Sequence, residues 1–412
     1  MQNDNTLNYD TILSFQNEYV LPTYAPALML IKGKGTYVWD NNNNKYIDFT
    51  CGISVCNLGH CHPAINSAIK KQCEQLVHVS NLFINTQQPL LAKKIRDISF
   101  EGKVFFCNSG AEANEGMIKL ARKWGNPKGK YEIITMLDSF HGRTLATLAA
   151  TGRAKYREGF EPELDGFKHI PFNRIEAVET AIKDSKGRTA AILLEPIQGE
   201  GGIIPGQIEY LLKLRQLCDE NEILLLFDEV QSGMGRTGKF FAFQHYGVIP
   251  DVMSMAKALG NGYPIGAFIA QKKLDKVLLP GTHASTFGGT PLACSVAISV
   301  IDTYKKENIL NNVQVMGNKS LQLLKKLSAK YRFIKEIRGT GLMLGIVLDR
   351  EAAAVSKLAQ INGLLIITAG SNVLRFYPPL NVNENELVEA VNILDKTFSM
   401  LCESGYFSEC SS

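Results

Sequence analysis

The sequence has no long hydrophobic run and no excess of charge of one sign. Uninterrupted apolar stretches such as residues 223–227 are far too short to cross a bilayer. Its 44 Lys and Arg residues against 40 Asp and Glu residues leave a net charge of only +4, without basic blocks. These absences argue against a membrane protein and give no indication of nucleic acid as a partner. Residues 1–7 also lack the basic start of a signal peptide and the Arg-rich pattern of a transit peptide, so we expect a cytoplasmic protein.

Cysteine is sparse, with nine residues spread over 412 positions, and an odd count of this kind is typical of buried thiols in a reducing compartment. One local cluster contains zinc-ligand residue types, but its spacing is neither C-x2-C nor H-x3-H. Its members are Cys51, Cys56, His60, Cys61 and His62. A non-catalytic zinc-binding protein is therefore one hypothesis, and buried thiols beside a loop are the alternative.

Apolar strands alternate with helices through the middle of the chain, after about residue 80. Strands that are apolar throughout and separated by helices predict a mainly parallel sheet covered by helices, hence an α/β fold. The strands expected are residues 104–107, 133–136, 190–194, 223–227 and 252–256.

The two ends of the chain follow a different pattern. We expect a helix at 11–17, a hairpin formed by 32–40 and 45–50 around an Asn-rich turn, and a helix at 63–76. After a long helix at 308–327, the sequence predicts a smaller α+β unit. Its expected elements are strands at 341–348, 364–368 and 373–377 and a final helix from Glu384.

Lys257 ends the predicted buried strand at 252–256, and Gly260 and Gly262 follow it closely. Burial disfavours the ammonium form and lowers the pKa of a lysine. A neutral amine is a nucleophile toward aldehydes and ketones. Most lysines near strand ends extend into solvent instead. Lys257 is therefore a candidate Schiff-base residue whose role depends on its surroundings.

A second candidate region follows the strand at 104–107. In open α/β sheets, ligands bind beyond the carboxyl ends of the strands. Ser109, Gly110 and Ala111 open a helix there, and their backbone N–H groups suit a phosphate. An ordinary N-cap by Asn108 or Ser109 is the alternative.

Asp228 directly follows the apolar strand at 223–227, where an acid is costly unless it is paired. A protonated ring nitrogen of a cofactor is a suitable partner. A structural Asp capping a loop and a magnesium ligand are the alternatives. The magnesium interpretation requires a Gly-x4-Gly-Lys-Ser/Thr loop upstream, and the sequence contains none.

Two further loops at strand ends carry suitable side chains. Phe140 could stack on a flat ring, and Arg143 could bind a carboxylate with two hydrogen bonds. Glu195 and Glu200 lie on a Gly-rich loop. Taken singly, a core aromatic and a surface arginine are the favoured interpretations of Phe140 and Arg143, and a plain turn is the alternative for the Gly-rich loop.

Together, a phosphate site, a ring-nitrogen carboxylate, a stacking aromatic and a Schiff-base lysine describe a pyridoxal 5′-phosphate (PLP) site. The chain resembles the class III (subgroup II) PLP-dependent aminotransferases of fold type I, and among them the acetylornithine aminotransferases. The matching stretches run in family order from about residue 20 to 400. They are LGHCHP at 58–63, FFCNSGAEAN at 105–114, FHGRT at 140–144, EPIQGEGG at 195–202, FDEVQSG at 227–233, GRTG at 235–238, KALG at 257–260 and TFGG at 286–289.

This resemblance implies a role for each matching residue. Lys257 would bond covalently to PLP and Asp228 would pair with the pyridine nitrogen. The remaining cofactor residues implied are Ser109, Gly110, Ala111, Phe140, Val230, Gln231 and, from the neighbouring subunit of a homodimer, Thr286. The substrate residues implied are Arg143, Glu200, Ser285 and Arg375, with Glu200 and Arg375 acting as a gate.

The resemblance also implies a domain division and a reaction. Residues 1–60 would join the small domain, 61–310 would form the large PLP-binding domain and 311–412 the C-terminal small domain. The implied reaction moves the terminal amine of N2-acetyl-L-ornithine to 2-oxoglutarate, a step of arginine biosynthesis. The chain departs from the family pattern at Ser232, Met234 and Thr290, which stand where Thr, Val and Asn are commoner.

Other donors remain open at this point. Succinylornithine, ornithine and 4-aminobutyrate aminotransferases share nearly every motif. Ornithine enzymes usually have Trp where this chain has His141, which disfavours that alternative. A nicotinamide oxidoreductase is excluded, because the glycine run at 339–345 is one residue too long for the fingerprint and opens a strand.

Overall fold

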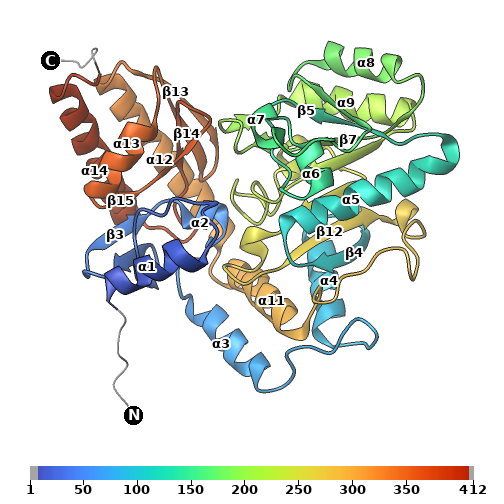
Figure 1. Cartoon of the computed structure of the whole chain (residues 1–412), viewed down its shortest axis with the longest axis horizontal. Helices are drawn as coiled ribbons and strands as arrows, with labels where there is room; N and C mark the ends of the chain where they lie inside the picture. Colours follow the sequence, from blue (N-terminus) through green and yellow to red (C-terminus); the bar gives the residue numbers. More distant parts are fainter. Residues whose placement is uncertain (1–7, 408–412) are drawn as a thin grey trace.

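The computed structural model describes residues 8–407 and shows two lobes (Figure 1). One lobe contains the seven-stranded sheet with its helices. The other contains elements from both ends of the chain, coloured blue and orange to red in Figure 1. Among residues 8–407, no helix is both long and apolar enough to span a bilayer.

The central sheet has the strand order β4-β12-β11-β10-β7-β5-β6. Neighbouring strands pair in parallel from β11 to β6, and β12 alone runs antiparallel to both of its neighbours. The expectation of a mainly parallel α/β sheet is therefore confirmed. The strands are β4 (Gly102–Cys107), β5 (Glu132–Met136), β6 (Phe167–Ile170), β7 (Thr189–Leu194), β10 (Leu224–Asp228), β11 (Val252–Met255) and β12 (Gly266–Gln271).

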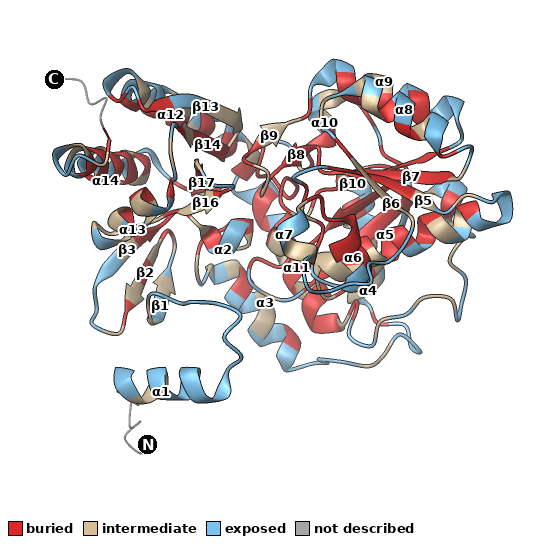
Figure 2. Cartoon of the chain, turned by 45° about the horizontal axis from the view of Figure 1, so that its top comes forward, coloured by how far each residue is buried: buried red, intermediate tan, exposed pale blue. Residues whose placement is uncertain are grey.

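The central strands β7, β10 and β11 are buried along their whole length (Figure 2). Because both faces of these strands are covered, their sequences are nearly continuous apolar runs. Helix α5 (Gly110–Gly125) packs against β11 and β12, and its buried face includes Met117 and Leu120. The other helices of this lobe are α4 (Gln87–Ile98), α6 (Leu145–Ala150), α7 (Ala154–Arg157), α8 (Ile175–Asp184), α9 (Ile208–Glu220) and α10 (Phe243–Tyr246), with the short pair β8 (Ile197–Gln198) and β9 (Ile204–Pro205).

The second lobe holds two four-stranded sheets, ordered β1-β2-β3-β15 and β13-β14-β17-β16. In the first sheet, β3 pairs in parallel with β15, so a strand from the N-terminal segment and one from the C-terminal part form a single sheet. This pairing supports the proposal that residues 1–60 join the C-terminal domain. The strands are β1 (Leu30–Lys34), β2 (Tyr37–Asp40), β3 (Lys45–Asp48), β13 (Ile334–Thr340), β14 (Met343–Leu348), β15 (Leu364–Leu365), β16 (Ile367–Ala369) and β17 (Val373–Phe376).

Helices complete this lobe and connect the two. Helices α12 and α14 pack against each other, and α11 packs against α3 and α4. The helices are α1 (Tyr9–Tyr19), α2 (Cys51–Ser54), α3 (Pro63–Cys73), α11 (Pro291–Lys306), α12 (Ile309–Lys330), α13 (Ala353–Ile361) and α14 (Glu384–Glu403).

Two expected strands are wrong in detail. The strand expected at 32–40 is split into β1 and β2, because Gly35 adopts a φ of 57° and reverses the chain. The strand expected at 364–368 is split into β15 and β16, which belong to different sheets.

Arg236 joins the two lobes through a guanidinium that is completely buried. It donates to Ser54 Oγ at 3.0 Å and contacts Asn57 Oδ1, both in the N-terminal segment. It also donates to the carbonyl oxygens of Leu342 at 3.1 Å and Pro378 at 2.6 Å. A buried charge satisfied by three parts of the chain fixes their relative position.

Candidate active site

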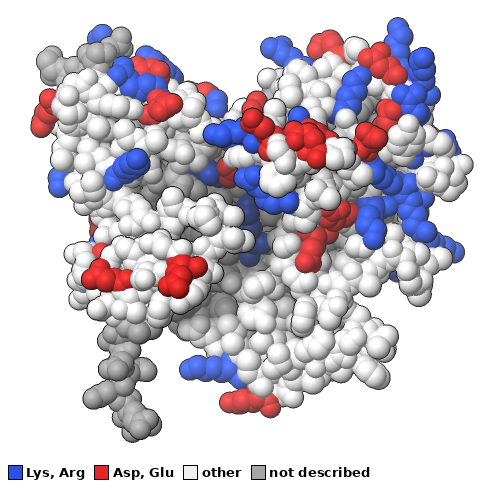
Figure 3. Space-filling view, viewed as in Figure 1, with Lys and Arg blue, Asp and Glu red and all other residues white. Residues whose placement is uncertain are grey.

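A cavity of about 390 Å³ lies at the carboxyl ends of β4, β5, β7, β10 and β11. The face in Figure 3 is hollowed between the two lobes, with Lys and Arg side chains at the edge of the hollow. Most of the residues that the sequence singled out line this cavity, and they come from several separate loops. These are Ser109, Gly110, Ala111, Phe140, Arg143, Glu195, Glu200, Asp228, Val230, Gln231 and Lys257.

Lys257 lies directly after β11, at the start of a 3₁₀ turn (Lys257–Leu259), with a φ of 47°. Left-handed backbone at a residue with a side chain is strained and is characteristic of functional sites. Burial lowers the pKa of Lys257; the carboxylates of Asp228 and Glu200 oppose this effect, and Arg375 adds to it. Within residues 8–407, no hydrogen bond or ion pair occupies its amine. The geometry therefore presents an amine suited to nucleophilic attack.

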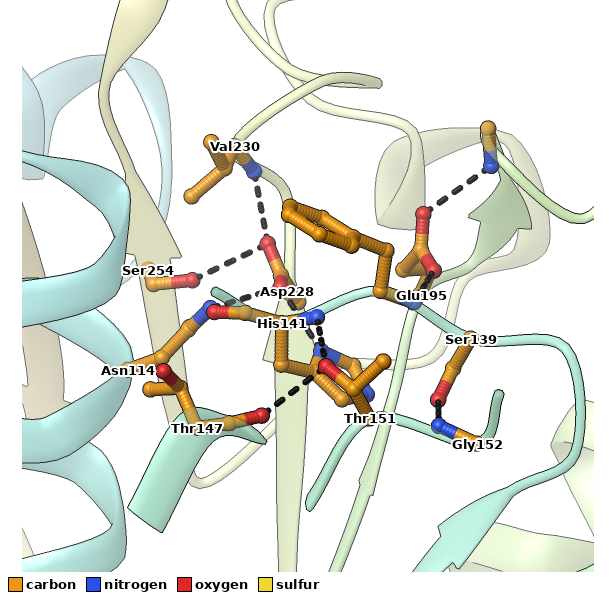
Figure 4. Close-up of polar contacts among 12 residues, drawn as sticks. Asn114, Ser139, His141, Thr147, Thr151, Gly152, Glu195, Asp228, Val230 and Ser254 are labelled. Atoms are coloured by element: carbon orange, nitrogen blue, oxygen red, sulfur yellow. Dashed lines mark hydrogen bonds and ion pairs between the residues drawn. The ribbon is translucent and has the colours of Figure 1, made fainter. Parts of the chain in front are cut away.

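Asp228 ends β10 at the floor of the cavity and is almost completely buried. Its Oδ2 lies 2.8 Å from His141 Nδ1 and accepts a hydrogen bond from Asn114 Nδ2 at 2.7 Å (Figure 4). Its Oδ1 accepts from the backbone N–H of Val230 at 3.0 Å and from Ser254 Oγ at 3.4 Å. These partners hold the carboxylate in one orientation, as a group that stabilises a buried positive charge must be held.

The start of α5 forms the opposite side of the cavity. Ser109 caps the helix by accepting from the N–H of Glu112 at 3.1 Å. A Cβ on Gly110 would lie 2.7 Å from Val230 Cγ1, so the close approach of these two loops requires glycine. The cap and a phosphate site are compatible, because the helix N-terminus still directs backbone N–H groups toward the cavity.

Phe140 and Arg143 lie together on the loop after β5. The backbone N–H of Phe140 donates to Glu195 Oε1 at 3.0 Å, which fixes the loop. The Arg143 guanidinium lies 5.5 Å from the centre of the Phe140 ring. Arg143 is exposed on one side and lines the cavity on the other, so its donors are available to an anionic substrate.

Glu200 and Arg375 form an ion pair at the edge of the cavity. One guanidinium nitrogen contacts Glu200 Oε1, and Nη2 lies 3.3 Å from Oε2. Arg375 is buried and also donates to the carbonyl oxygen of Thr368 at 2.7 and 3.1 Å. Glu200 lines the cavity and Arg375 lies behind it. The arginine is thus neutralised by an acid that stands between it and the cavity.

The zinc hypothesis finds no support at the cysteine cluster. His60 Nε2 lies 2.8 Å from Asp48 Oδ2, and Cys51 Sγ donates to the carbonyl oxygen of Tyr377 at 3.1 Å. Across residues 8–407, no three His, Cys, Asp or Glu side chains come together as metal ligands.

Comparison with known proteins identifies the family. The family model described as Aminotransferase class-III matches residues 20–398. The chain belongs to the class III aminotransferases. It is 52% identical to the acetylornithine aminotransferase of Caldanaerobacter subterraneus subsp. tengcongensis, over 94% of this chain and 99% of that relative.

Two further comparisons place this aminotransferase within its class. It is 43% identical to the succinylornithine transaminase/acetylornithine aminotransferase of Pseudomonas aeruginosa, over 93% of this chain and 96% of that one. The solved ornithine aminotransferase from Toxoplasma gondii superposes with a TM-score of 0.92 at 33% identity, covering 97% of this chain and 96% of that chain. The fold-type I architecture expected from the sequence is therefore confirmed.

The cofactor of this class is PLP, and the cavity of this aminotransferase fits it. A partly buried amine, an oriented carboxylate, a helix N-terminus and an aromatic ring surround one space of suitable size. Two buried polar atoms beside Asp228, His141 Nε2 and Asn114 Oδ1, have no hydrogen-bond partner among the described residues. Unsatisfied buried polar atoms at a cavity are expected where a ligand or water completes the network.

Two predicted residues, Ser285 and Thr286, lie outside the cavity in this aminotransferase. They border two neighbouring depressions instead. Thr286 is exposed. Gln231 lines the cavity, and its Oε1 accepts a hydrogen bond from the Tyr377 hydroxyl at 2.8 Å. The roles assigned to these residues stay predictions.

Sequence reasoning missed the two side chains that hold Asp228. In the sequence, His141 serves only as a marker against ornithine enzymes, and Asn114 is only part of a matching motif. Both lie in stretches that match the family: His141 follows Phe140 directly, and Asn114 lies one helical turn after Ala111. A buried acid at a strand end requires partners, so polar residues in these matching stretches are the available signal.

Glu195 supplies a test of the electrostatics of this site. Burial raises the pKa of Glu195 from 4.5 to about 7; His141 opposes the shift and Asp228 adds to it. The folded state therefore binds the proton more tightly, and the stabilising contribution of Glu195 is complete below its unfolded pKa and lost as the pH rises to about 7.

We expect the free energy of unfolding of the cofactor-free wild type to decrease relative to that of Glu195→Gln between pH 4.5 and 7, by at most about 3 kcal/mol. Urea unfolding of both proteins across this range measures the difference. A difference that stays constant with pH would show that Glu195 titrates alike in the folded and unfolded states.

Proposed function

We propose that this chain is an acetylornithine aminotransferase, which transfers the terminal amine of N2-acetyl-L-ornithine to 2-oxoglutarate and yields the 5-semialdehyde and L-glutamate. The observation that carries the proposal is the Glu200–Arg375 ion pair near Lys257, at a cavity that Arg143 also lines. The name of the Caldanaerobacter relative supports the choice of donor within the class.

PLP, when bound, forms a covalent bond to the substrate nitrogen and accepts the electrons released when the adjacent C–H bond breaks. Lys257 would hold the cofactor through its amine, and it is the residue placed to move a proton at the reacting substrate carbon. Asp228, held by His141 and Asn114, would pair with the ring nitrogen and keep it protonated.

The arginines explain how one site accepts two different amines. The donor reacts at its terminal amine, far from its carboxylate, whereas glutamate reacts beside a carboxylate. An unpaired cation next to the reacting carbon would oppose the first substrate, because a buried charge without a partner is costly. Glu200 neutralises Arg375 in the first half-reaction and would release it for the α-carboxylate in the second. Arg143 would bind the remote carboxylate in both.

Glu200→Ala should depress the acetylornithine half-reaction by about tenfold while leaving the glutamate half-reaction within about twofold, since only the first requires a neutralised arginine. Single-turnover kinetics of each half, followed through the cofactor spectrum, measure both effects. Glu209→Ala, an exposed acid on α9, is the matched control and should change neither half. Equal losses in both halves would refute the gate and leave the aminotransferase assignment intact.

The choice of donor is tested directly by steady-state kinetics. We expect kcat/KM to be highest for acetylornithine among acetylornithine, succinylornithine, ornithine, lysine and 4-aminobutyrate. Succinylornithine is the closest alternative, supported by the double name of the Pseudomonas relative. If kcat/KM is highest for ornithine, the proposed donor is wrong, and so is the inference that His141 disfavours an ornithine enzyme.

We further propose a homodimer in which Thr286 serves the cofactor of the neighbouring subunit. Thr286 is exposed and lies outside its own cavity. Large apolar side chains near it are also exposed, with 85% of Leu82, 95% of Ile84 and 61% of Phe287 accessible in the single chain. A surface of this kind is typical of an interface. Light scattering on the purified protein tests the dimer.

We also propose that the protein is located in the cytoplasm.

A further inference from the structure

Arg143 has no charged partner to hold it in place. Within residues 8–407, no acid forms an ion pair with it and no hydrogen bond fixes its guanidinium. It is nonetheless placed at the rim of the cavity. An unrestrained arginine loses about 2 kcal/mol of rotamer entropy when it binds a ligand. The feature that restrains Arg143 is therefore a determinant of substrate affinity.

The ring of Tyr156, in α7, provides this restraint. The Arg143 guanidinium lies 4.0 Å from the centre of the Tyr156 ring, closer than the 5.5 Å to Phe140. The guanidinium of Arg153 lies 5.9 Å from the same ring. Phe140 meets Tyr156 edge to face, with ring centres 5.9 Å apart and planes at 87°. Tyr156 therefore contacts both Arg143 and the ring expected to stack on the cofactor.

Tyr156 does not line the cavity itself. Its hydroxyl makes no hydrogen bond to another described residue, so Tyr156 contacts Arg143 through the face of its aromatic ring. Helix α7 is anchored by Arg157, which donates to the carbonyl oxygen of Thr151 at 2.7 Å and to Glu163 at 3.0 Å. The ring is thus a fixed platform outside the site.

We propose that Tyr156 is a positioning residue that determines specificity for substrates with a remote carboxylate, by holding the Arg143 guanidinium at the rim of the cavity. This inference rests on the proposed function for the identity of the donor. It assigns Tyr156 no contact with substrate or cofactor. An effect that passes through Arg143 depends on the carboxylate, whereas an effect that passes through Phe140 does not.

The test compares two donors that differ only in that carboxylate. N2-acetylornithine has it, and N-(4-aminobutyl)acetamide is the same molecule without it. In the PLP-loaded enzyme, Tyr156→Leu should raise KM for acetylornithine about fivefold, the loss of one cation–π contact, with kcat within about twofold. KM for the amide analogue should not change. Tyr156→Phe keeps the aromatic face and should behave as wild type with both donors.

A double-mutant cycle shows whether Tyr156 acts through Arg143. On an Arg143→Leu background, adding Tyr156→Leu should change KM for acetylornithine by less than about twofold, because the coupled partner is already absent. Additive losses, equal losses with both donors, or a Tyr156→Phe defect equal to that of Tyr156→Leu would each overturn the proposal. If Tyr156→Leu fails to fold, Tyr156→Met gives the same comparison.

The same comparison can be made on the second half-reaction. L-Glutamate carries a remote carboxylate, and L-norvaline replaces it with a methyl group. If the wild-type enzyme reacts with glutamate but not with acetylornithine, the proposed donor is refuted. The comparison of glutamate with norvaline would still test the role of Tyr156. A Tyr156→Leu protein that treats glutamate as wild type does would refute the positioning role itself.

Discussion

Lys257→Ala will lower turnover by roughly 10⁴-fold and leave the fold intact. The variant removes the amine that bonds to the cofactor and carries the proton, and acid–base groups of this kind contribute up to about that factor. Because burial lowers the pKa of Lys257, its charged form opposes folding, so its removal should not lower the thermal midpoint of the cofactor-free protein. Alanine also accepts the φ of 47° no worse than lysine does.

Single-turnover kinetics with glutamate and a thermal melt on the same preparation measure both effects. Lys272→Ala, an exposed lysine outside the cavity, is the matched control and should be normal in both. Borohydride reduction of the wild type, followed by peptide mapping, identifies the modified lysine directly. A label on any residue other than Lys257 would show that the central assignment is wrong.

Asp228→Asn should lower turnover by about 10³-fold while the protein retains some bound cofactor. A neutral amide cannot keep a ring nitrogen protonated. The amide also cannot accept from His141 and Asn114 on one side and from Val230 on the other, so a moderate loss of stability is expected. The decisive quantity is turnover per folded, cofactor-loaded molecule.

Asp251 offers a matched control for this variant. It is also fully buried, at the start of β11, where it pairs with Arg215 at 2.9 Å and contacts Lys273. It lies outside the cavity. Asp251→Asn should therefore lose stability with near-normal turnover per folded molecule. If Asp228→Asn behaves in the same way, Asp228 is a structural residue.

Much of the site could be predicted because it lies where a regular pattern ends. Strand β10 is apolar up to Asp228, and β11 is mostly apolar and ends just before Lys257. In each case the change from apolar to charged residues marks a residue of the cavity. The partners of Asp228 gave no such signal. Asn114 and His141 are 114 and 87 residues away from it in the chain. The parallel order of β5, β7 and β10 brings His141 to Asp228, and the packing of α5 on the sheet brings Asn114 there.

The sequence does not predict strands β12 and β6, because both depend on pairing with strands that are distant in the chain. Strand β12 was not expected, because it follows the glycine-rich turn after Lys257 and depends on antiparallel pairing with β4 and β11. Strand β6 is only partly buried at the edge of the sheet, so its apolar pattern is weak. Long-range pairing overrides local preference at such positions.

The pairing of β3 with β15 has a consequence for the order in which the chain can fold during synthesis. Ile47 donates its N–H to the carbonyl oxygen of Gly363 at 2.9 Å, and Phe49 donates to that of Leu365 at 2.9 Å. The seven strands of the central sheet have all been synthesised at Gln271. Strand β3, in contrast, lacks its partner β15 until the ribosome reaches residue 365. Arg236 likewise waits for Leu342 and Pro378 to satisfy its guanidinium. The first residues made are therefore among the last to become native, and the buried side chain of Ile47 in β3 stays unprotected until then.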